Sequence, residues 1–398
     1  MVWLLAMLAC GDVPAQSELS THRPAAALLP DIDDLQRPFD KQLDPWFCPC
    51  TTGLESDELD VQIEGDLTAR RTDLRSWHGE LVVFLHAKKQ HPNANEFVLY
   101  TAARAGYRAL GVDYETEPVV GQLCEEEYPG DTDCPPSATL ARIYGSEFDD
   151  YLFVDDEASV TGALYASLVD NHDRFPDEGW DRYFEQAPLG AIDHDRFPDE
   201  GWDRYFEQAP LGAIDHEAHI RWDRIVLGGY STGATIAAMI GTRERLDGVV
   251  LVGGPNESDW LTEGETPGCA WFAIDHVEHV DQLRRTQMWT ALGIPTAEAL
   301  VSPLPEGVCD NDWPPYDGSH RLISDLDPIE SCPVPTAIHG SLARDACMNV
   351  DAALPGDEYG LFRAYMYMFC AAGLVDADPL TRTCNAIDSP RSELVEAQ

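Results

Sequence analysis

The sequence predicts an α/β protein built on a mostly parallel, doubly wound sheet, with helices on both faces and a small cap region. Short, continuously apolar runs alternate with segments whose apolar residues have helical spacing, which is typical of parallel strands buried on both faces. A second observation is the order apolar run, Gly-Tyr-Ser-Thr-Gly, small-residue helical run over residues 225–240. A third is the composition, since 398 residues of which 44% are hydrophobic suffice for one large core.

The predicted elements follow in order along the chain. Strands are expected where short apolar runs occur, at residues 81–85, 108–114, 225–227, 248–252, 270–273 and 334–338. Helices are expected at residues 95–105, directly after residue 233, and at 359–371, whereas residues 119–165 indicate loop and helix without a strand. Because strands alternate with helices, the connections should be right-handed crossovers.

The N-terminal part has a different character from the rest of the chain. Residues 1–10 form a short apolar segment that resembles a signal peptide ending in a bacterial lipobox, in which Cys10 would carry a lipid. Residues 11–50 are rich in Pro, Asp, Ala and Gln and resemble a tether, so the globular domain is expected within residues 51–390. We therefore expect an exported protein, either a cell-envelope lipoprotein tethered to the membrane through Cys10 or a secreted protein.

A tandem duplication interrupts the domain at residues 172–215. Residues 172–193 recur without a single change as residues 194–215, which indicates a recent duplication or an assembly artefact of the sequence. A functional repeat array would need three or more units. We therefore expect one copy to fit the scaffold and the other to form a surface insertion without a catalytic role.

The net charge excludes several classes of partner. The chain has 71 acidic and 26 basic residues, a net charge of −45, and such a surface repels nucleic acid and anionic lipid headgroups. No acidic run has the spacing of a calcium-binding loop, although Asp310, Asp312 and Asp317 come near it. We expect a solvated acidic surface, no nucleic-acid partner and no obligate protein partner.

The cysteines indicate disulfides rather than a metal. Eleven are present, and ten remain if Cys10 is lipidated, an even number that suits an exported protein with a disulfide framework. We predict the pairs Cys124–Cys134 and Cys332–Cys347. Zinc is the competing interpretation, but no paired C-x-x-C motif is present.

Ser231, at the centre of Gly-Tyr-Ser-Thr-Gly, is the predicted nucleophile; the alternative is a structural turn serine. Glycines at residues 229 and 233 permit a sharp strand-to-helix turn that exposes the serine hydroxyl at the edge of the sheet. The base is predicted to be His339, which follows the last predicted strand, with His320 as a weaker choice.

The acid that orients the base should follow the strand at residues 270–273. Glu278 is the predicted acid, with Asp275 and Asp281 as alternatives. The same segment allows a metal site of His276, Glu278 and His279, but it lacks the H-E-x-x-H pattern, so no metal and no cofactor is expected.

The predicted oxyanion hole combines the backbone amide of Thr232 with that of Ala87 or Lys88 in the loop after the strand at residues 81–85. Lys88 and Lys89 are notable neighbours in a chain so poor in basic residues. Their charge would help to hold a developing oxyanion or an anionic substrate; the alternative is a solvated turn.

Five segments together resemble one known family: LVVFLHAKKQ, AARAGYRALGVDY, QLCEEEYPGDTDC, RWDRIVLGGYSTG and AIHGSLARD. They are similar to exported bacterial α/β-hydrolases of the lipase and esterase type, whose cap carries a two-cysteine segment after the fourth strand. The resemblance covers about residues 75–375 and implies the α/β-hydrolase fold, with Ser231 as nucleophile, His339 as base and the acid in the loop at residues 275–281. The chain departs from the family at His86-Ala87, where His-Gly is usual, and at Tyr230 and Thr232, where His and Gln are frequent.

The expected function is hydrolysis of a small-molecule or lipid carboxylic ester through a covalent acyl-enzyme. Two alternatives stay open: an amidase or peptidase that uses the same triad, and a non-catalytic surface lipoprotein that keeps the hydrolase fold.

Overall fold

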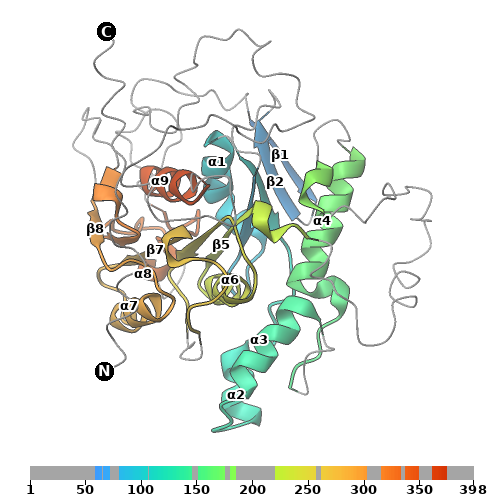
Figure 1. Cartoon of the computed structure of the whole chain (residues 1–398). Helices are drawn as coiled ribbons and strands as arrows, with labels where there is room; N and C mark the ends of the chain where they lie inside the picture. Colours follow the sequence, from blue (N-terminus) through green and yellow to red (C-terminus); the bar gives the residue numbers. More distant parts are fainter. Residues whose placement is uncertain are drawn as a thin grey trace, which may run out of the picture.

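A computed structural model describes residues 59–64, 66–71, 80–105, 107–145, 151–174, 180–184, 220–256, 261–302, 315–332, 337–348 and 361–373. Within these residues nine strands form one sheet in the order β1-β2-β4-β3-β5-β6-β7-β9-β8 (Figure 1). The seven strands from β4 to β8 in this order are mutually parallel, and β1 and β2 join the β4 edge antiparallel. The predicted mostly parallel sheet is therefore confirmed.

The strands are short and most are completely buried. Their bounds are β1 Leu59–Glu64, β2 Asp66–Arg71, β3 Leu81–Leu85, β4 Arg108–Val112, β5 Ile225–Tyr230, β6 Gly248–Val252, β7 Trp271–His276, β8 Glu298–Val301 and β9 Arg321–Ser324. Burial on both faces explains why the central strands are continuous apolar runs instead of alternating patterns.

Helices cover both faces of the sheet (Figure 1). Their bounds are α1 Glu96–Arg104, α2 Val120–Glu127, α3 Cys134–Tyr144, α4 Val160–Arg174, α6 Thr232–Arg243, α7 Gln282–Ala291, α8 Ala337–Gly340 and α9 Phe362–Gly373. Helices α1 and α9 share one core with Val82 and Phe84 of β3, whereas α4 and α6 share the other with Leu81, Val83 and Leu85. The alternate residues of one strand thus serve two cores.

The predicted last strand at residues 334–338 is contradicted at residues 337 and 338, which form the start of helix α8, and its first three residues lie outside the described residues. The sequence itself argues against a central strand here, since the prolines at 333 and 335 cannot donate ladder hydrogen bonds. The missed strands are short or polar: β9 reads Arg-Leu-Ile-Ser, and β8 is largely exposed at the sheet edge. The alternating sequence of β1 could have identified it as an edge strand.

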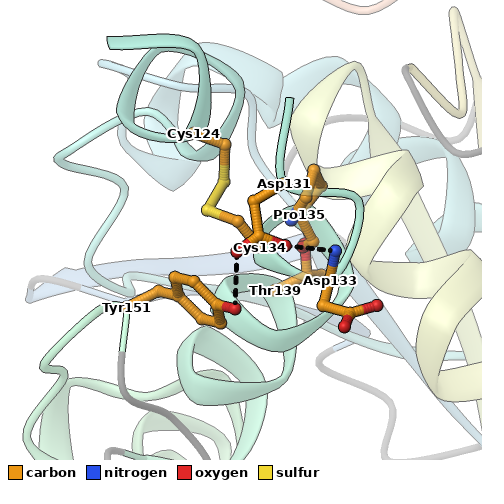
Figure 2. The surroundings of a disulfide bond; sticks show 7 residues. All are labelled: Cys124, Asp131, Asp133, Cys134, Pro135, Thr139 and Tyr151. Carbon is orange, nitrogen blue, oxygen red and sulfur yellow. Dashed lines mark hydrogen bonds between the residues drawn. A yellow bond between two sulfur atoms is a disulfide. The ribbon is translucent and has the colours of Figure 1, made fainter. Parts of the chain in front are cut away.

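Helices α2 and α3 form a cap, here residues 120–144, which extends beyond the sheet at the bottom of the view in Figure 1. The predicted disulfide Cys124–Cys134 joins the two helices, and Tyr151 donates a 3.0 Å hydrogen bond to Asp131 in the turn between them (Figure 2). The second predicted disulfide, Cys332–Cys347, is also present. The apolar core of the cap is small. The disulfide therefore contributes to the stability of the cap by linking its two helices covalently.

Some predicted regions lie outside the described residues: the signal segment 1–10, the tether 11–50, the second repeat copy 194–215, and the acidic residues Asp310 and Asp312. In the described part of the chain, every helix is too short or too polar to cross a bilayer.

The first repeat copy contributes to the core where the structure describes it. Trp180 and Tyr183 are completely buried, and Trp180 lies beneath the guanidinium of Arg108 at 5.3 Å. Phe184 forms an antiparallel bridge with Ile220, which leads into β5. These contacts give the first copy a structural role in the scaffold.

We predict that Trp180→Ala lowers the free energy of unfolding by about 3–5 kcal/mol, because a fully buried indole leaves a cavity. Trp202→Ala, the same change in the second copy, should alter it by less than about 0.5 kcal/mol. Urea unfolding followed by circular dichroism measures both.

The control is Trp180→Ala in a chain that lacks residues 194–215, since the second copy cannot then replace the first. That deletion alone should leave stability unchanged. Equal losses in the Trp180 and Trp202 variants would contradict the structural role of a single copy.

Candidate active site

Ser231 occupies a strained turn between β5 and α6. Its backbone has φ 57° and ψ −112°, a conformation that residues other than glycine rarely adopt. A Cβ at Gly229 would overlap the carbonyl oxygen of Gly233, and a Cβ at Gly233 would overlap that of Leu85. The two glycines therefore permit the turn and bring the start of α6 against the end of β3.

The hydroxyl of Ser231 accepts a hydrogen bond from Asn256, with 3.2 Å between Nδ2 and Oγ. The other side of the Asn256 amide faces Arg285, whose Nη2 lies 2.8 Å from Oδ1. Because a guanidinium can only donate, the amide oxygen must face Arg285 and the amide nitrogen must face the serine. Ser231 Oγ is thus an acceptor in this contact and keeps its own proton for another partner.

His339 lies in α8 and lines the same cavity as Ser231. Its ring packs at 4.8 Å from that of Tyr230 and at 4.9 Å from that of His279, and the Tyr230 hydroxyl donates a 3.0 Å hydrogen bond to its carbonyl oxygen. Its Nδ1 is buried and has no hydrogen-bond partner among the described residues. Burial, together with the positive charge of Arg285, lowers the pKa of His339 to about 3, so the ring is neutral at pH 7.

The three predicted acids occupy different environments. Asp275, at the end of β7, is completely buried, and both of its carboxylate oxygens accept from Arg285 Nη1, at 2.9 and 3.0 Å. Glu278 is exposed and does not line the cavity, whereas Asp281 is exposed and does line it. Among the described residues, none of the three accepts a hydrogen bond from His339, so the choice of acid stays a prediction.

The predicted oxyanion donors gather beside Ser231. Thr232 and Lys88 line the cavity, and Ala87 is buried next to Lys88. Thr232 is the first residue of α6, where backbone amides have no partner within the helix. Tyr114 holds the loop after β3 by donating a 2.7 Å hydrogen bond to the carbonyl oxygen of His86.

His276 and His320, two further histidines that the sequence analysis considered, have structural partners. His276 accepts from the backbone amide of Glu278 through Nδ1, so its Nε2 carries the proton and donates to the carbonyl of Leu326 at 3.1 Å. The ring of His320 stacks on that of Phe272, and its Nδ1 lies 2.9 Å from a backbone carbonyl oxygen in β7. No group of three or more potential metal ligands occurs within the ranges that the structure describes.

One cavity, with a volume of about 460 Å³, is lined by Ser231, Thr232, Lys88 and His339. Its lining comes from the cap helices, the loop after β3, the turn at Ser231, helix α7 and His339. This volume is in the range of small-molecule sites. The cavity also lies where the chain leaves β3 for β4 and later returns to β5 on the other side, the topological switch point at which open α/β sheets bind ligands.

Asn256 and Arg285 are site residues that the sequence interpretation missed. Asn256 follows β6 at the carboxyl edge of the sheet, and that position could have identified it. Arg285 has no such signal, because it lies within a polar helix next to another arginine.

No protein-family model and no curated protein sequence matches the chain. Among solved structures, EstE5, soaked with p-nitrophenyl butyrate, is 12% identical and has a TM-score of 0.29, with 69% of this chain and 81% of that chain covered. Carboxyl esterase 2 from the mycorrhizal fungus Tuber melanosporum is 12% identical with a TM-score of 0.34, over 81% and 89% of the two chains. Esterase B from Lactobacillus rhamnosis is 11% identical with a TM-score of 0.28, over 59% and 70%.

Scores this low carry no argument about function. The α/β-hydrolase fold follows instead from the strand order, the parallel sheet with helices on both faces, and the Gly-Tyr-Ser-Thr-Gly turn after β5. The predicted fold class is confirmed.

We predict that Arg285→Met lowers the free energy of unfolding by about 3–5 kcal/mol, because Asp275 then stays buried without its cation. The double variant Asp275→Asn, Arg285→Met should recover more than half of this loss, since it buries no unpaired charge. Urea unfolding at pH 7 gives both values.

Arg243→Met is the matched control, because Arg243 is exposed and is the last residue of helix α6. This substitution should change the free energy of unfolding by less than about 0.5 kcal/mol. Asp275→Asn alone completes the double-mutant cycle. If the losses of Arg285→Met and Asp275→Asn simply add in the double variant, the ion pair is not the stabilising interaction.

Proposed function

We propose that this protein is a serine hydrolase that cleaves carboxylic esters through a covalent acyl-enzyme. The observation that carries the proposal is the strained backbone of Ser231, which places the hydroxyl in a cavity that also contains His339 and the first amides of α6. Backbone strain of this kind costs about 1–3 kcal/mol and persists where the surrounding structure enforces it.

The proposed reaction begins when Ser231 Oγ attacks the acyl carbon and His339 takes the serine proton. The amide of Thr232 and that of Ala87 or Lys88 donate to the oxyanion of the tetrahedral intermediate. The intermediate collapses, and the alcohol leaves with the proton from His339. Water then attacks the acyl-enzyme by the same route, which releases the acid and restores Ser231.

The contact between Ser231 and Asn256 supports this assignment of roles. Asn256 occupies one lone pair of Oγ as a donor, so the serine proton stays available to a base. The same donor stabilises the negative charge that develops on Oγ as its proton leaves. A direct hydrogen bond between Ser231 and His339 would form in the substrate complex, since catalytic hydrogen bonds tighten there.

The orienting acid is part of the proposal. Of the three carboxylates predicted from the sequence, only Asp281 lines the cavity together with His339. Asp275 accepts hydrogen bonds from Arg285 and from the backbone amide of His276. Without a carboxylate on its Nδ1, His339 would act as a neutral base whose orientation comes from its packing against Tyr230 and His279.

The absence of a carboxylate partner for His339 among the described residues also favours a second candidate function. In that case the protein is a binding module that keeps the hydrolase fold without catalysis. An amidase or peptidase would use the same groups as the esterase.

We further propose that the protein works outside the cytoplasm, as a lipoprotein or a secreted enzyme. Two disulfides support this location, since such bonds form and persist in oxidising compartments.

We predict that a fluorophosphonate probe labels the oxidised, wild-type protein and that Ser231→Ala and His339→Ala abolish labelling, because one removes the nucleophile and the other its base. Ser137→Ala, a serine of α3 outside the cavity lining, should be labelled like the wild type. Gel fluorescence measures labelling, and circular dichroism checks that each variant is folded. A folded but unlabelled wild type would favour the binding module.

We also predict that labelling persists into acid. Because the pKa of His339 is lowered to about 3, its neutral form predominates at pH 5, where an ordinary histidine would be only about 3% neutral. The labelling rate at pH 5 should therefore be at least about half of that at pH 8. A fall of tenfold or more between pH 7 and pH 5 would indicate instead that a carboxylate pairs with His339 and restores its pKa.

A further inference from the structure

We propose that the cavity recognises an ester whose acid or alcohol part carries a free carboxylate. This inference rests on the proposed ester hydrolysis and names its substrate class. Its basis is the charge of the cavity lining, which differs in sign from the charge of the chain as a whole.

The described lining contains twice as many basic as acidic side chains. The basic residues are Lys88, Arg142, Arg284 and Arg285, and the acidic residues are Glu125 and Asp281. In the whole chain, acidic residues outnumber basic ones by 71 to 26. A protein with few basic residues thus places four of them around one cavity. Such a concentration of positive charge attracts anionic ligands.

The basic side chains come from three separate parts of the fold. Lys88 lies in the loop after β3, Arg142 in helix α3 of the cap, and Arg284 and Arg285 in helix α7. These elements are far apart in the sequence, and their basic side chains all line the cavity. A run of neighbouring basic residues on one helix would be a solvated face, whereas polar groups that converge from separate elements are typical of a ligand site.

Lys88 is the clearest candidate for binding the substrate anion. Its side chain is exposed and forms no ion pair with any residue that the structure describes. The neighbouring Lys89, in contrast, lies 3.4 Å from a carboxylate oxygen of Glu117 and does not line the cavity. In a chain with a large excess of carboxylates, Lys88 lines the cavity of Ser231 without an ion pair to any described residue, so its charge is available to a ligand.

Arg142 adds a second charge that forms no ion pair with the described residues, although Glu115 and Glu117 act on it electrostatically. It is 1% exposed, and its guanidinium donates to the backbone carbonyl oxygens of Glu115 and Pro118, at 2.5 and 2.6 Å. These acceptors are neutral, so the formal charge of the arginine persists, and its buried Nε has no hydrogen-bond partner among the described residues. Arg285 differs, because Asp275 compensates its charge.

The basic side chains of the lining act on the reacting groups. Burial is the main cause that lowers the pKa of His339, and the positive charges of Arg285 and Lys88 lower it further. At His279 burial and Arg285 also lower the pKa, against the opposing effect of Asp275 and Asp281. A carboxylate in the cavity would form charge-assisted hydrogen bonds, which are about twice as strong as neutral ones.

Two esters of equal length test the proposal: mono-4-nitrophenyl succinate and 4-nitrophenyl butyrate, which differ by a carboxylate in place of a terminal methyl group. We expect kcat/KM of the wild type to be at least about tenfold higher for the succinate ester. Lys88→Gln should reduce the ratio of the two kcat/KM values about fivefold or more, whereas Lys89→Gln should leave the ratio within about twofold. Ser231→Ala provides the background rate, since the free carboxylate accelerates spontaneous hydrolysis of the succinate ester.

The outcomes separate this inference from the proposed function. Hydrolysis of the butyrate ester at an equal or higher kcat/KM overturns the anion preference and leaves the esterase proposal intact. A ratio that Lys88→Gln and Lys89→Gln reduce alike also overturns it, because a general charge effect would then explain the preference.

If neither ester is hydrolysed, calorimetric titration of monomethyl succinate into the Ser231→Ala protein tests whether the cavity binds a carboxylate. Binding that Lys88→Gln weakens supports an anion site even if the esterase proposal fails, and the absence of binding overturns it.

Discussion

Helix α6 approaches strand β3 so closely that their backbones are in contact at Gly233 and Leu85, and much of the site depends on this approach. It is possible because residues 229 and 233 have no side chains, and it forces the serine between them to a positive φ. Burial of the apolar residues of β5 and α6 offsets the strain. As a consequence, the serine hydroxyl, the first amides of α6 and the loop after β3 lie together at one edge of the sheet.

The order of the strands decides what else reaches this edge. The chain leaves β3 toward β4 and then forms the cap before it returns to β5 on the opposite side of β3. The cap helices therefore lie over the switch point, and the disulfide Cys124–Cys134 keeps them paired. The cap helices that the cysteine pair joins and the turn at Ser231 are far apart in the sequence, yet both line a single cavity.

Arg285 determines the electrostatics inside that cavity. It pairs with the buried Asp275, orients the amide of Asn256 toward Ser231, and adds to the burial that lowers the pKa of His339. An arginine cannot lose its proton within a protein, so these effects persist over the whole physiological pH range. Asp275 is therefore the counter-ion of Arg285 in this structure, and among the described residues it accepts no hydrogen bond from His339.

The sequence by itself determined the features that local physics encodes. Apolar runs identified the central strands, glycine spacing identified the turn at Ser231, and both described disulfides followed from the cysteine pattern. Only the tertiary structure decided the pairing of Asp275 with Arg285, the orientation of Asn256, and the excess of basic side chains around one cavity. The physical reason is that a strand or a turn depends on neighbouring residues, whereas a buried ion pair depends on which side chains the packing of separate elements brings within about 4 Å of each other.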